Sequence, residues 1–315
     1  MKQLVLWLAL LVCPMALAQD RIIVSGASGQ LGSLVIDELL ARKVSPENLI
    51  LVSRTPNSDH LQAYAARGAS VRFGDFNEPE SLDAAYRGGT RMLLISINGG
   101  GGNRRELHKG ASDAAARVGV KQIAYTSYVN ADRYEDSTIA VDHRRTELIL
   151  EESGVAWTML RNQIYANGLL DQAVQIVRDG RYVTHTPDAR VAYVTREDCA
   201  AAAAAVLATP GHENKAYNIT GPDAIGPREL VALASEISGK PVELVVLSEA
   251  DYRAQLTASG VPEAAINGTI SFAAELESQY LQEPSTAVAD LTGRPATSVR
   301  ALLLQNRERL RDAAN

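Results

Sequence analysis

Short apolar runs alternate with amphipathic stretches along most of this chain. The runs are rich in Ile, Val and Leu, and the stretches between them repeat apolar residues at helical spacing. The predicted strands are 21–25, 49–52, 70–73, 91–95, 122–126 and 157–160, and the predicted helices between them are 61–67, 80–86, 104–118 and 142–152. This alternation is typical of βαβ units. It predicts an α/β fold with a Rossmann-like, doubly wound parallel sheet, whose ligands bind at the carboxyl ends of the strands.

The pattern changes after residue 221. Gly-Pro pairs at 221–222 and 226–227 break the chain, and short amphipathic stretches follow, such as 228–238 and 249–259. These features predict a small, mostly helical lobe that covers a substrate cleft. We therefore expect a dinucleotide-binding domain at 19–222 and a substrate lobe at 223–315.

The first predicted strand runs directly into Gly-x-x-Gly-x-x-Gly, which opens the first predicted helix. Gly26 allows the tight turn, Gly29 lets the backbone approach a pyrophosphate, and Gly32 lets the helix pack against the strand. This turn predicts a bound dinucleotide, held by the three glycines together with Ser28, Gln30 and Leu31. A glycine-rich turn without a ligand is the alternative.

The ends of the next three strands offer further cofactor contacts. Arg54 stands where an NAD-binding protein usually has an acidic residue, and its guanidinium suits the 2′-phosphate of NADP(H). An ordinary exposed arginine is the alternative. Asp75 either binds the adenine amino group or caps a turn. Ser96, Ile97 and Asn98 are expected beside the cofactor ribose and nicotinamide.

Residues 1–18 have the pattern of a secretory signal peptide. Lys2 precedes an apolar run at 4–12 that is too short for a membrane span, and small residues at 16–18 suit a cleavage site. The pattern predicts export to the periplasm or the medium. A misassigned start codon, with the protein in the cytoplasm, is the alternative.

Composition narrows the partners of the mature chain. With 46% hydrophobic and 22% charged residues and a net charge of −6, the full chain is typical of globular proteins and lacks the basic character of nucleic-acid binders. No stretch after residue 18 is apolar enough to span a membrane, and the five histidines are scattered without a metal-binding motif. We expect a small-molecule substrate and no metal. A homodimer is one possible assembly of the chain.

Several motifs occur in the same order as in one known family. The chain resembles the NmrA-like atypical short-chain dehydrogenases/reductases, and in particular their bacterial NAD(P)H:quinone oxidoreductases. The matching segments are 26–32, 93–96, 119–127, 143–147, 160–162, 195–200, 217–221 and 291–295. The resemblance implies an NADP(H) cofactor and a quinone substrate, with Asn162 and Tyr165 closing over the nicotinamide. Asn130 stands where similar proteins tend to have His.

One expected catalytic pair is missing. Classical short-chain dehydrogenases protonate an alkoxide with a Tyr four residues before a Lys, and the chain contains no Tyr-x-x-x-Lys. A quinone needs less help, because hydride addition gives a delocalised phenolate that takes its proton from water. His143 is the candidate acid or orienting group, and Tyr165 and Asn98 complete the candidate catalytic set. A non-catalytic NADP(H) sensor is the main alternative to quinone reduction, and an epimerase or lyase is a third.

Overall fold

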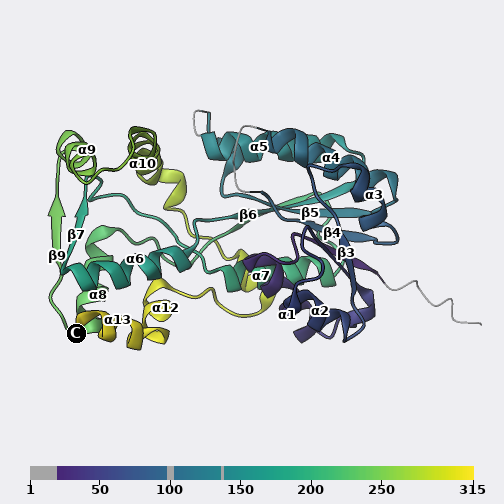
Figure 1. The fold of residues 1–315 in the computed structure, drawn as a ribbon, viewed down its shortest axis with the longest axis horizontal. Coiled ribbons are helices and arrows are strands. Elements are labelled where there is room, and N and C mark those ends of the chain that lie inside the picture. The colour runs from purple at the N-terminus through teal and green to yellow at the C-terminus, as the bar shows by residue number, and fades with distance from the viewer. Residues whose placement is uncertain (1–19, 98–102, 136–137) are drawn as a thin grey trace, which may run out of the picture.

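The computed structural model describes residues 20–97, 103–135 and 138–315. Figure 1 shows two parts side by side, a helix-covered sheet and a lobe built mainly of helices. The chain passes from one part to the other several times, so the two parts are not simple successive halves of the sequence.

A seven-stranded parallel sheet forms the centre of the first part. Its order is β3 (Ser70–Phe73), β2 (Leu49–Ser53), β1 (Ile22–Ser25), β4 (Arg91–Leu94), β5 (Gln122–Tyr128), β6 (Ala156–Asn162) and β8 (Lys215–Ile219). The order reverses between β1 and β4, and a crevice forms at such a reversal beyond the carboxyl ends of the strands. The predicted α/β, Rossmann-like fold class is therefore confirmed. The strand β8 was not predicted.

Helices cover both faces of this sheet. Helices α1 (Gln30–Ala41), α2 (Asp59–Ala65) and α7 (Arg196–Ala208) lie on one face, and α3 (Glu80–Tyr86), α4 (Arg104–Arg117) and α5 (Thr138–Glu152) on the other (Figure 1). The alanine block at 200–205 is fully buried where α7 packs against α1 and the sheet. Small side chains allow this close approach.

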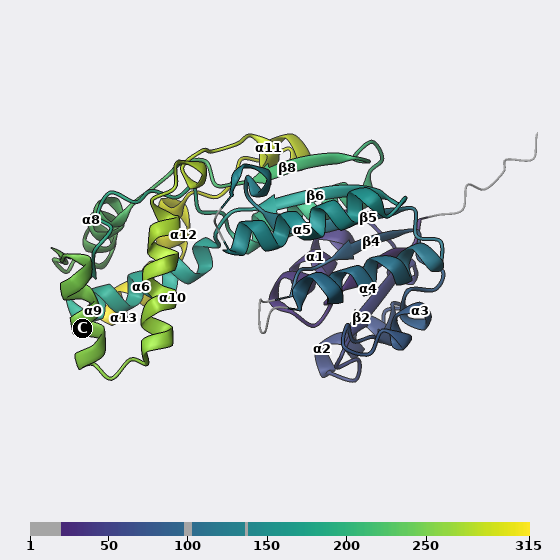
Figure 2. The same ribbon diagram turned by 90° about the horizontal axis from the view of Figure 1, so that it is seen from above.

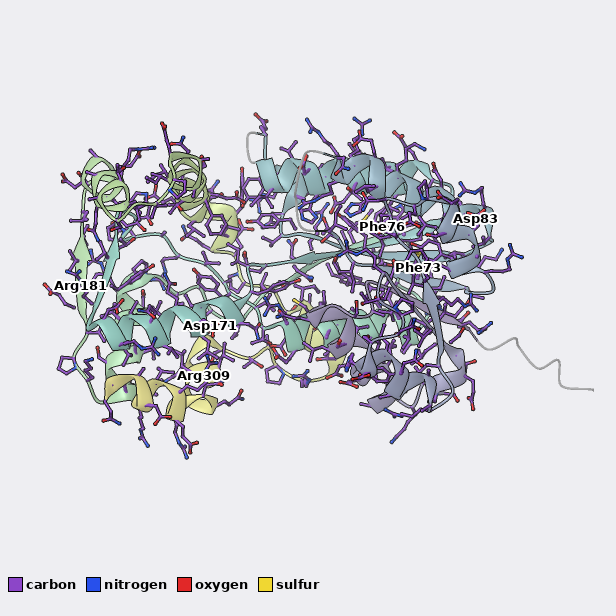
Figure 3. The ribbon with its side chains drawn as sticks, in the orientation of Figure 1. Phe73, Phe76, Asp83, Asp171, Arg181 and Arg309 are labelled. Carbon is purple, nitrogen blue, oxygen red and sulfur yellow. The ribbon has the colours of Figure 1, made fainter. Side chains whose placement is uncertain are left out.

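A second apolar core holds the lobe together. It joins α6 (Ala166–Asp179), α8 (Pro227–Ser238), α12 (Val299–Gln305) and α13 (Arg307–Ala314). The parallel pair β7 (Arg181–Thr184) and β9 (Glu243–Val246) belongs to the lobe (Figure 1), and the helices α9 (Glu249–Ala258) and α10 (Glu263–Leu276) complete it (Figure 2). Arg309 of α13 pairs with Asp171 of α6 at 2.9 Å (Figure 3).

The expected boundary at residue 222 does not match this packing. Helix α6 and strand β7 precede the boundary but lie in the lobe, because the apolar face of α6 packs against α8 and α13. Helix α11 (Ala287–Thr292) follows the boundary but packs on α7 and β8 of the sheet domain. Short 3-10 turns η1 (Pro46–Asn48), η2 (Ala131–Arg133) and η3 (Gln279–Leu281) lie in the connections. None of the helices in the described residues is long and apolar enough to cross a bilayer.

Candidate active site

The glycine-rich turn lies at the centre of the sheet, between β1 and α1. Gly26 has a φ of +93°, in the left-handed region that favours glycine. A Cβ on Gly32 would lie 2.3 Å from the carbonyl oxygen of Gly26, so no larger residue fits there. No side chain caps the start of α1 at Gly29, which leaves N–H groups of the first helical turn available to an anion. This is the cradle that a pyrophosphate requires.

Side chains beside this turn connect it to the end of β2. The hydroxyls of Ser28 and Ser53 are hydrogen-bonded at 2.8 Å, which braces the turn against the neighbouring strand. Arg54, directly after Ser53, is exposed, as are Ser28 and Gln30. The side chain of Leu31 is buried in the core, so only its backbone can face a ligand. The structure thus brings the predicted phosphate contacts together at one edge of the sheet.

Asp75 follows β3 and caps a turn. Its carboxylate accepts hydrogen bonds from the backbone N–H of Asn77 at 2.9 Å and from the side-chain amide of Asn77 at 3.1 Å. Of the two predicted roles, the structure shows the turn-capping one. Binding of the adenine amino group by Asp75 stays a prediction.

Hydrogen bonds from neighbouring elements fix the segment after β4. The N–H of Ser96 donates to Oγ1 of Thr126 at 2.8 Å, and the N–H of Ile97 donates to Nε2 of His108 at 3.2 Å. His108 is fully buried, and burial, with the charge of Arg104 as a smaller cause, lowers its pKa to about 3. The imidazole is therefore neutral, as its acceptor role at Nε2 requires. Asn98, predicted next in this segment, lies outside the described residues.

His143 is enclosed in the core of the domain. Its side chain is 7% exposed, its Nδ1 is hydrogen-bonded to the Tyr125 hydroxyl at 2.8 Å, and its ring stacks on Tyr128. Burial, followed by the charges of Arg104 and His108, lowers the pKa of His143 to about 3. This environment fits the orienting role predicted for His143. It does not fit a general acid that titrates near neutral pH.

Asn162 and Tyr165 meet at the end of β6, and their closure over the nicotinamide stays a prediction. The Asn162 amide donates to the Tyr165 hydroxyl at 3.3 Å, while its buried Oδ1 has no hydrogen-bond partner. The guanidinium of Arg196 lies 5.0 Å from the centre of the Tyr165 ring. Because an unpaired buried acceptor is costly, Asn162 Oδ1 is a candidate contact for a ligand N–H group.

Comparison with known proteins decides the family. A profile described as NAD(P)H-binding matches residues 26–210. Quinone oxidoreductase 2 of Escherichia coli (strain K12) is 35% identical over 278 residues, which cover 88% of this chain and 96% of that protein. The chain belongs to the NAD(P)H-binding family. The NmrA-like family resemblance noted in the sequence and the expected nicotinamide cofactor are thereby confirmed.

Solved structures of this family extend the agreement to the whole fold. An NADPH-dependent quinone oxidoreductase from Escherichia coli, complexed with NADPH, has a TM-score of 0.82 at 34% identity, and the match covers 90% of this chain and 99% of that one. The triphenylmethane reductase of a Citrobacter species, complexed with NADP(H), has a TM-score of 0.79 at 32% identity, with 93% and 99% covered.

A buried ion pair beneath the site had no counterpart in the sequence predictions. Glu147 on α5 is fully buried and accepts from the Ser127 hydroxyl at 2.7 Å and from two nitrogens of Arg161, each at 2.9 Å. Arg161 also pairs with Asp132 at 2.7 Å. This network holds β5, β6 and η2 together at the carboxyl edge of the sheet. In the sequence, position 147 belongs to the matching segment 143–147, but no role was predicted for it.

Asn130 has a structural role in place of a proton donor. It has a φ of 50°, in the left-handed region that Asn tolerates. Its backbone N–H donates to Oδ1 of Asn218, its Oδ1 accepts from Asn218, and its amide donates to the Tyr280 carbonyl. These contacts tie the end of β5 to β8 and η3.

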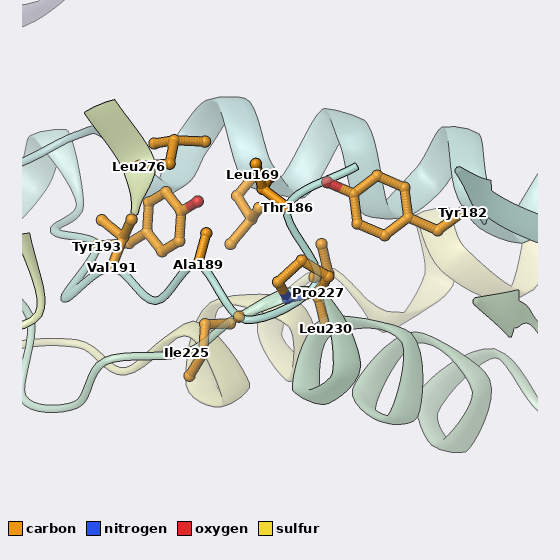
Figure 4. Close-up of a pocket in the computed structure, with 11 residues that line it drawn as sticks. Leu169, Tyr182, Thr186, Ala189, Val191, Tyr193, Ile225, Pro227, Leu230 and Leu276 are labelled. Atoms are coloured by element: carbon orange, nitrogen blue, oxygen red, sulfur yellow. The ribbon is translucent and has the colours of Figure 1, made fainter. Parts of the chain in front are cut away.

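Two hollows involve the lobe. A small cavity of about 30 Å³ lies under α6, and the hydroxyls of Tyr182 and Tyr193 point toward it from opposite sides (Figure 4). A larger groove of about 940 Å³ lies between residues 133–135 and Ile139 on one side and α10 and η3 on the other, with Tyr134, Glu275 and Tyr280 in its lining. Among the described residues, no group of three or more His, Cys, Asp or Glu is placed to hold a metal ion.

Proposed function

We propose that this protein is an NADPH-dependent oxidoreductase that reduces quinones by hydride transfer. The observation that carries the proposal is the 35% identity to a quinone oxidoreductase along 88% of the chain. The match to a quinone oxidoreductase structure that contains NADPH supports it.

The residues of the site fit this cofactor. The backbone at Gly32 leaves no room for a side chain, so α1 packs closely against the turn after β1, and the first turn of α1 is open to an anion. Arg54 is exposed at the end of β2, where its guanidinium can pair with a 2′-phosphate. The unpaired Oδ1 of Asn162 can accept from the nicotinamide amide group. When bound, the dinucleotide supplies the hydride.

The protein's own side chains favour a quinone over a simple ketone. The chain lacks the Tyr-x-x-x-Lys pair, and the buried His143 is neutral above about pH 3. Ketone reduction needs a proton donor of matched pKa beside the carbonyl. A quinone becomes a stabilised phenolate that water can protonate, so binding and orientation of the ring are sufficient.

Titration of the full chain with NADPH and with NADH, followed by addition of 1,4-naphthoquinone, tests this proposal. We expect tighter binding of NADPH and quinone-dependent loss of the reduced nicotinamide absorbance. Tight binding without turnover, across several quinones, would instead favour the NADP(H)-sensing function. Absence of dinucleotide binding would contradict both functions.

We also propose, from the sequence alone, that residues 1–18 are a signal peptide and that the protein is exported. These residues lie outside those that the structure describes. Mass spectrometry of the protein purified from its native cell fractions tests this proposal. A chain that begins at residue 19 supports export, whereas an intact N-terminus in the cytoplasmic fraction contradicts it.

A further inference from the structure

A short backbone segment, residues 95–97, leaves the sheet directly beside the glycine-rich turn. Strand β4 ends at Leu94, whereas its neighbour β5 continues to Tyr128. A Cβ built on Gly26 would lie 3.4 Å from the Cβ of Ile95, so the segment packs against this turn. Because β4 and β1 are neighbours where the strand order reverses, the segment belongs to the edge at which a dinucleotide is expected to bind.

Side chains from two other elements bind the N–H groups of this segment. The N–H of Ser96 donates to Oγ1 of Thr126 at 2.8 Å, and the N–H of Ile97 donates to Nε2 of His108 at 3.2 Å. Thr126 belongs to β5, whereas His108 reaches the segment from α4. The position of the segment therefore depends on two acceptors that lie outside its own strand.

The ring of His108 is fixed in one tautomer and one orientation. A backbone N–H can only donate, so Nε2 accepts and the proton of the neutral imidazole is on Nδ1. Nδ1 lies 3.1 Å from Oγ1 of Thr146, whose hydroxyl donates to the Asp142 carbonyl at 3.4 Å. The fully buried ring also meets Tyr125 edge to face, with centroids 5.4 Å apart. Helix α5 thereby supports the ring that holds the segment.

Apolar packing alone does not account for a histidine at this position. The other buried residues on the same face of α4 are small, and they include Ala111 and Ala115. A buried imidazole costs desolvation free energy that an apolar residue would avoid. The hydrogen bond from Ile97 is therefore what His108 supplies and an apolar residue could not.

We propose that His108 is a positioning residue for the nicotinamide half of the dinucleotide. By accepting from the N–H of Ile97, it fixes the backbone at 96–97 before the cofactor binds, which lowers the cost of ordering the site. His108 is fully buried and acts only through this segment. The inference rests on the proposed function and on the prediction that Ser96 and Ile97 lie beside the cofactor ribose and nicotinamide.

Two amide substitutions separate the bond to Ile97 from the other contacts of the ring. His108→Gln can place its terminal oxygen near the position of Nε2 and keeps an acceptor for the Ile97 N–H. His108→Asn reaches only the position of Nδ1, so it keeps a partner for Thr146 and leaves that N–H unpaired. We expect the Kd for NADPH, measured by calorimetry, to rise about tenfold in His108→Asn and to stay within about threefold of the wild-type value in His108→Gln.

Binding of 2′,5′-ADP shows which half of the cofactor is affected. This fragment carries the adenine and the 2′-phosphate but lacks the nicotinamide, so its affinity should be equal in the wild type and both variants. A histidine that only stabilises the fold would change the binding of both ligands or of neither. Equal losses of affinity for NADPH and 2′,5′-ADP in His108→Asn, unchanged NADPH binding there, or an equal loss in His108→Gln would overturn the proposal.

Thr158→Val is the matched control. The buried Thr158 hydroxyl accepts from the Gln122 amide at 2.9 Å and donates to the His212 carbonyl at 2.7 Å, toward the amino ends of β5 and β6. Its loss should lower the free energy of unfolding and leave the affinity for NADPH unchanged. Weakening of NADPH binding as large as in His108→Asn would overturn the proposal. If His108→Asn does not fold, the apolar variant His108→Leu takes its place, with the same expected result.

Calorimetry also keeps this inference separate from quinone turnover. If the wild type binds NADPH but oxidises it with no quinone, the proposed function fails, and the comparison of the variants still tests His108. If the wild type does not bind NADPH, both the proposed function and the role of His108 are overturned.

Discussion

Replacing His143 with Asn should make the stability of the protein less dependent on pH. In the folded protein His143 has a pKa of about 3, because it is buried and lies near positive charge. In the unfolded chain its pKa is about 6.5. As the pH falls below this value, the unfolded chain takes up a proton that the folded protein does not, so His143 lowers the stability of the wild type progressively between about pH 6.5 and pH 3.

The size of this effect follows from the two pKa values. Between about pH 7.5 and pH 5, proton uptake by one histidine in the unfolded chain alone lowers the free energy of unfolding by about 2 kcal/mol. The Asn variant loses the stacking on Tyr128 at every pH but keeps a polar atom near the Tyr125 hydroxyl. The wild type should therefore be more stable at both pH values, by a margin about 2 kcal/mol smaller at pH 5.

Urea unfolding of the full chain, followed by circular dichroism at both pH values, measures this margin. His60→Asn, which removes an exposed histidine, is the control for the substitution itself. A margin for His143→Asn that is equal at the two pH values would show that His143 protonates normally in the folded protein. That result would refute the argument and restore His143 as a candidate acid.

Two further substitutions test the cofactor contact and the buried ion pair. Arg54→Ala should raise the KM for NADPH about tenfold or more and leave that for NADH nearly unchanged, as steady-state kinetics with both cofactors would show. Equal effects on both cofactors would contradict selection through the 2′-phosphate. Glu147→Ala leaves the buried Arg161 guanidinium with only the more exposed Asp132 as its anionic partner, so the free energy of unfolding should fall by about 3 kcal/mol. Glu151→Ala, at a partly exposed ion pair, should cost less than about 1 kcal/mol, and similar losses in the two variants would contradict the account.

The sequence predicted the sheet domain closely because its signals are local. Apolar runs and glycines at fixed spacing specify strands and turns, and the predicted helix at 80–86 coincides with α3. Strand β8 was missed because the residues around Tyr217 do not form an apolar run. Hydrogen-bonded pairing with β6 stabilises the strand instead. The domain boundary was misplaced because the sequence does not show which apolar surface helix α6 packs against.

In the candidate site, too, residues next to strand ends were predicted from the sequence, and residues brought together by tertiary packing were not. The phosphate cradle and Arg54 are adjacent in sequence to strand ends, so the strand pattern located them. His108 was not singled out, although its place on the apolar face of 104–118 was a signal that it is buried. Glu275 lies more than a hundred residues after Tyr128 in the sequence, and only the tertiary fold brings the two together.

The most direct test of the central claim is the stoichiometry of NADPH oxidation by 1,4-naphthoquinone without oxygen. Hydride transfer to a bound quinone predicts one hydroquinone formed for each NADPH consumed, in a reaction that depends on the purified full chain and saturates with both substrates. Failure of the chain to consume NADPH, or NADPH consumption without an equal yield of hydroquinone, would contradict the account.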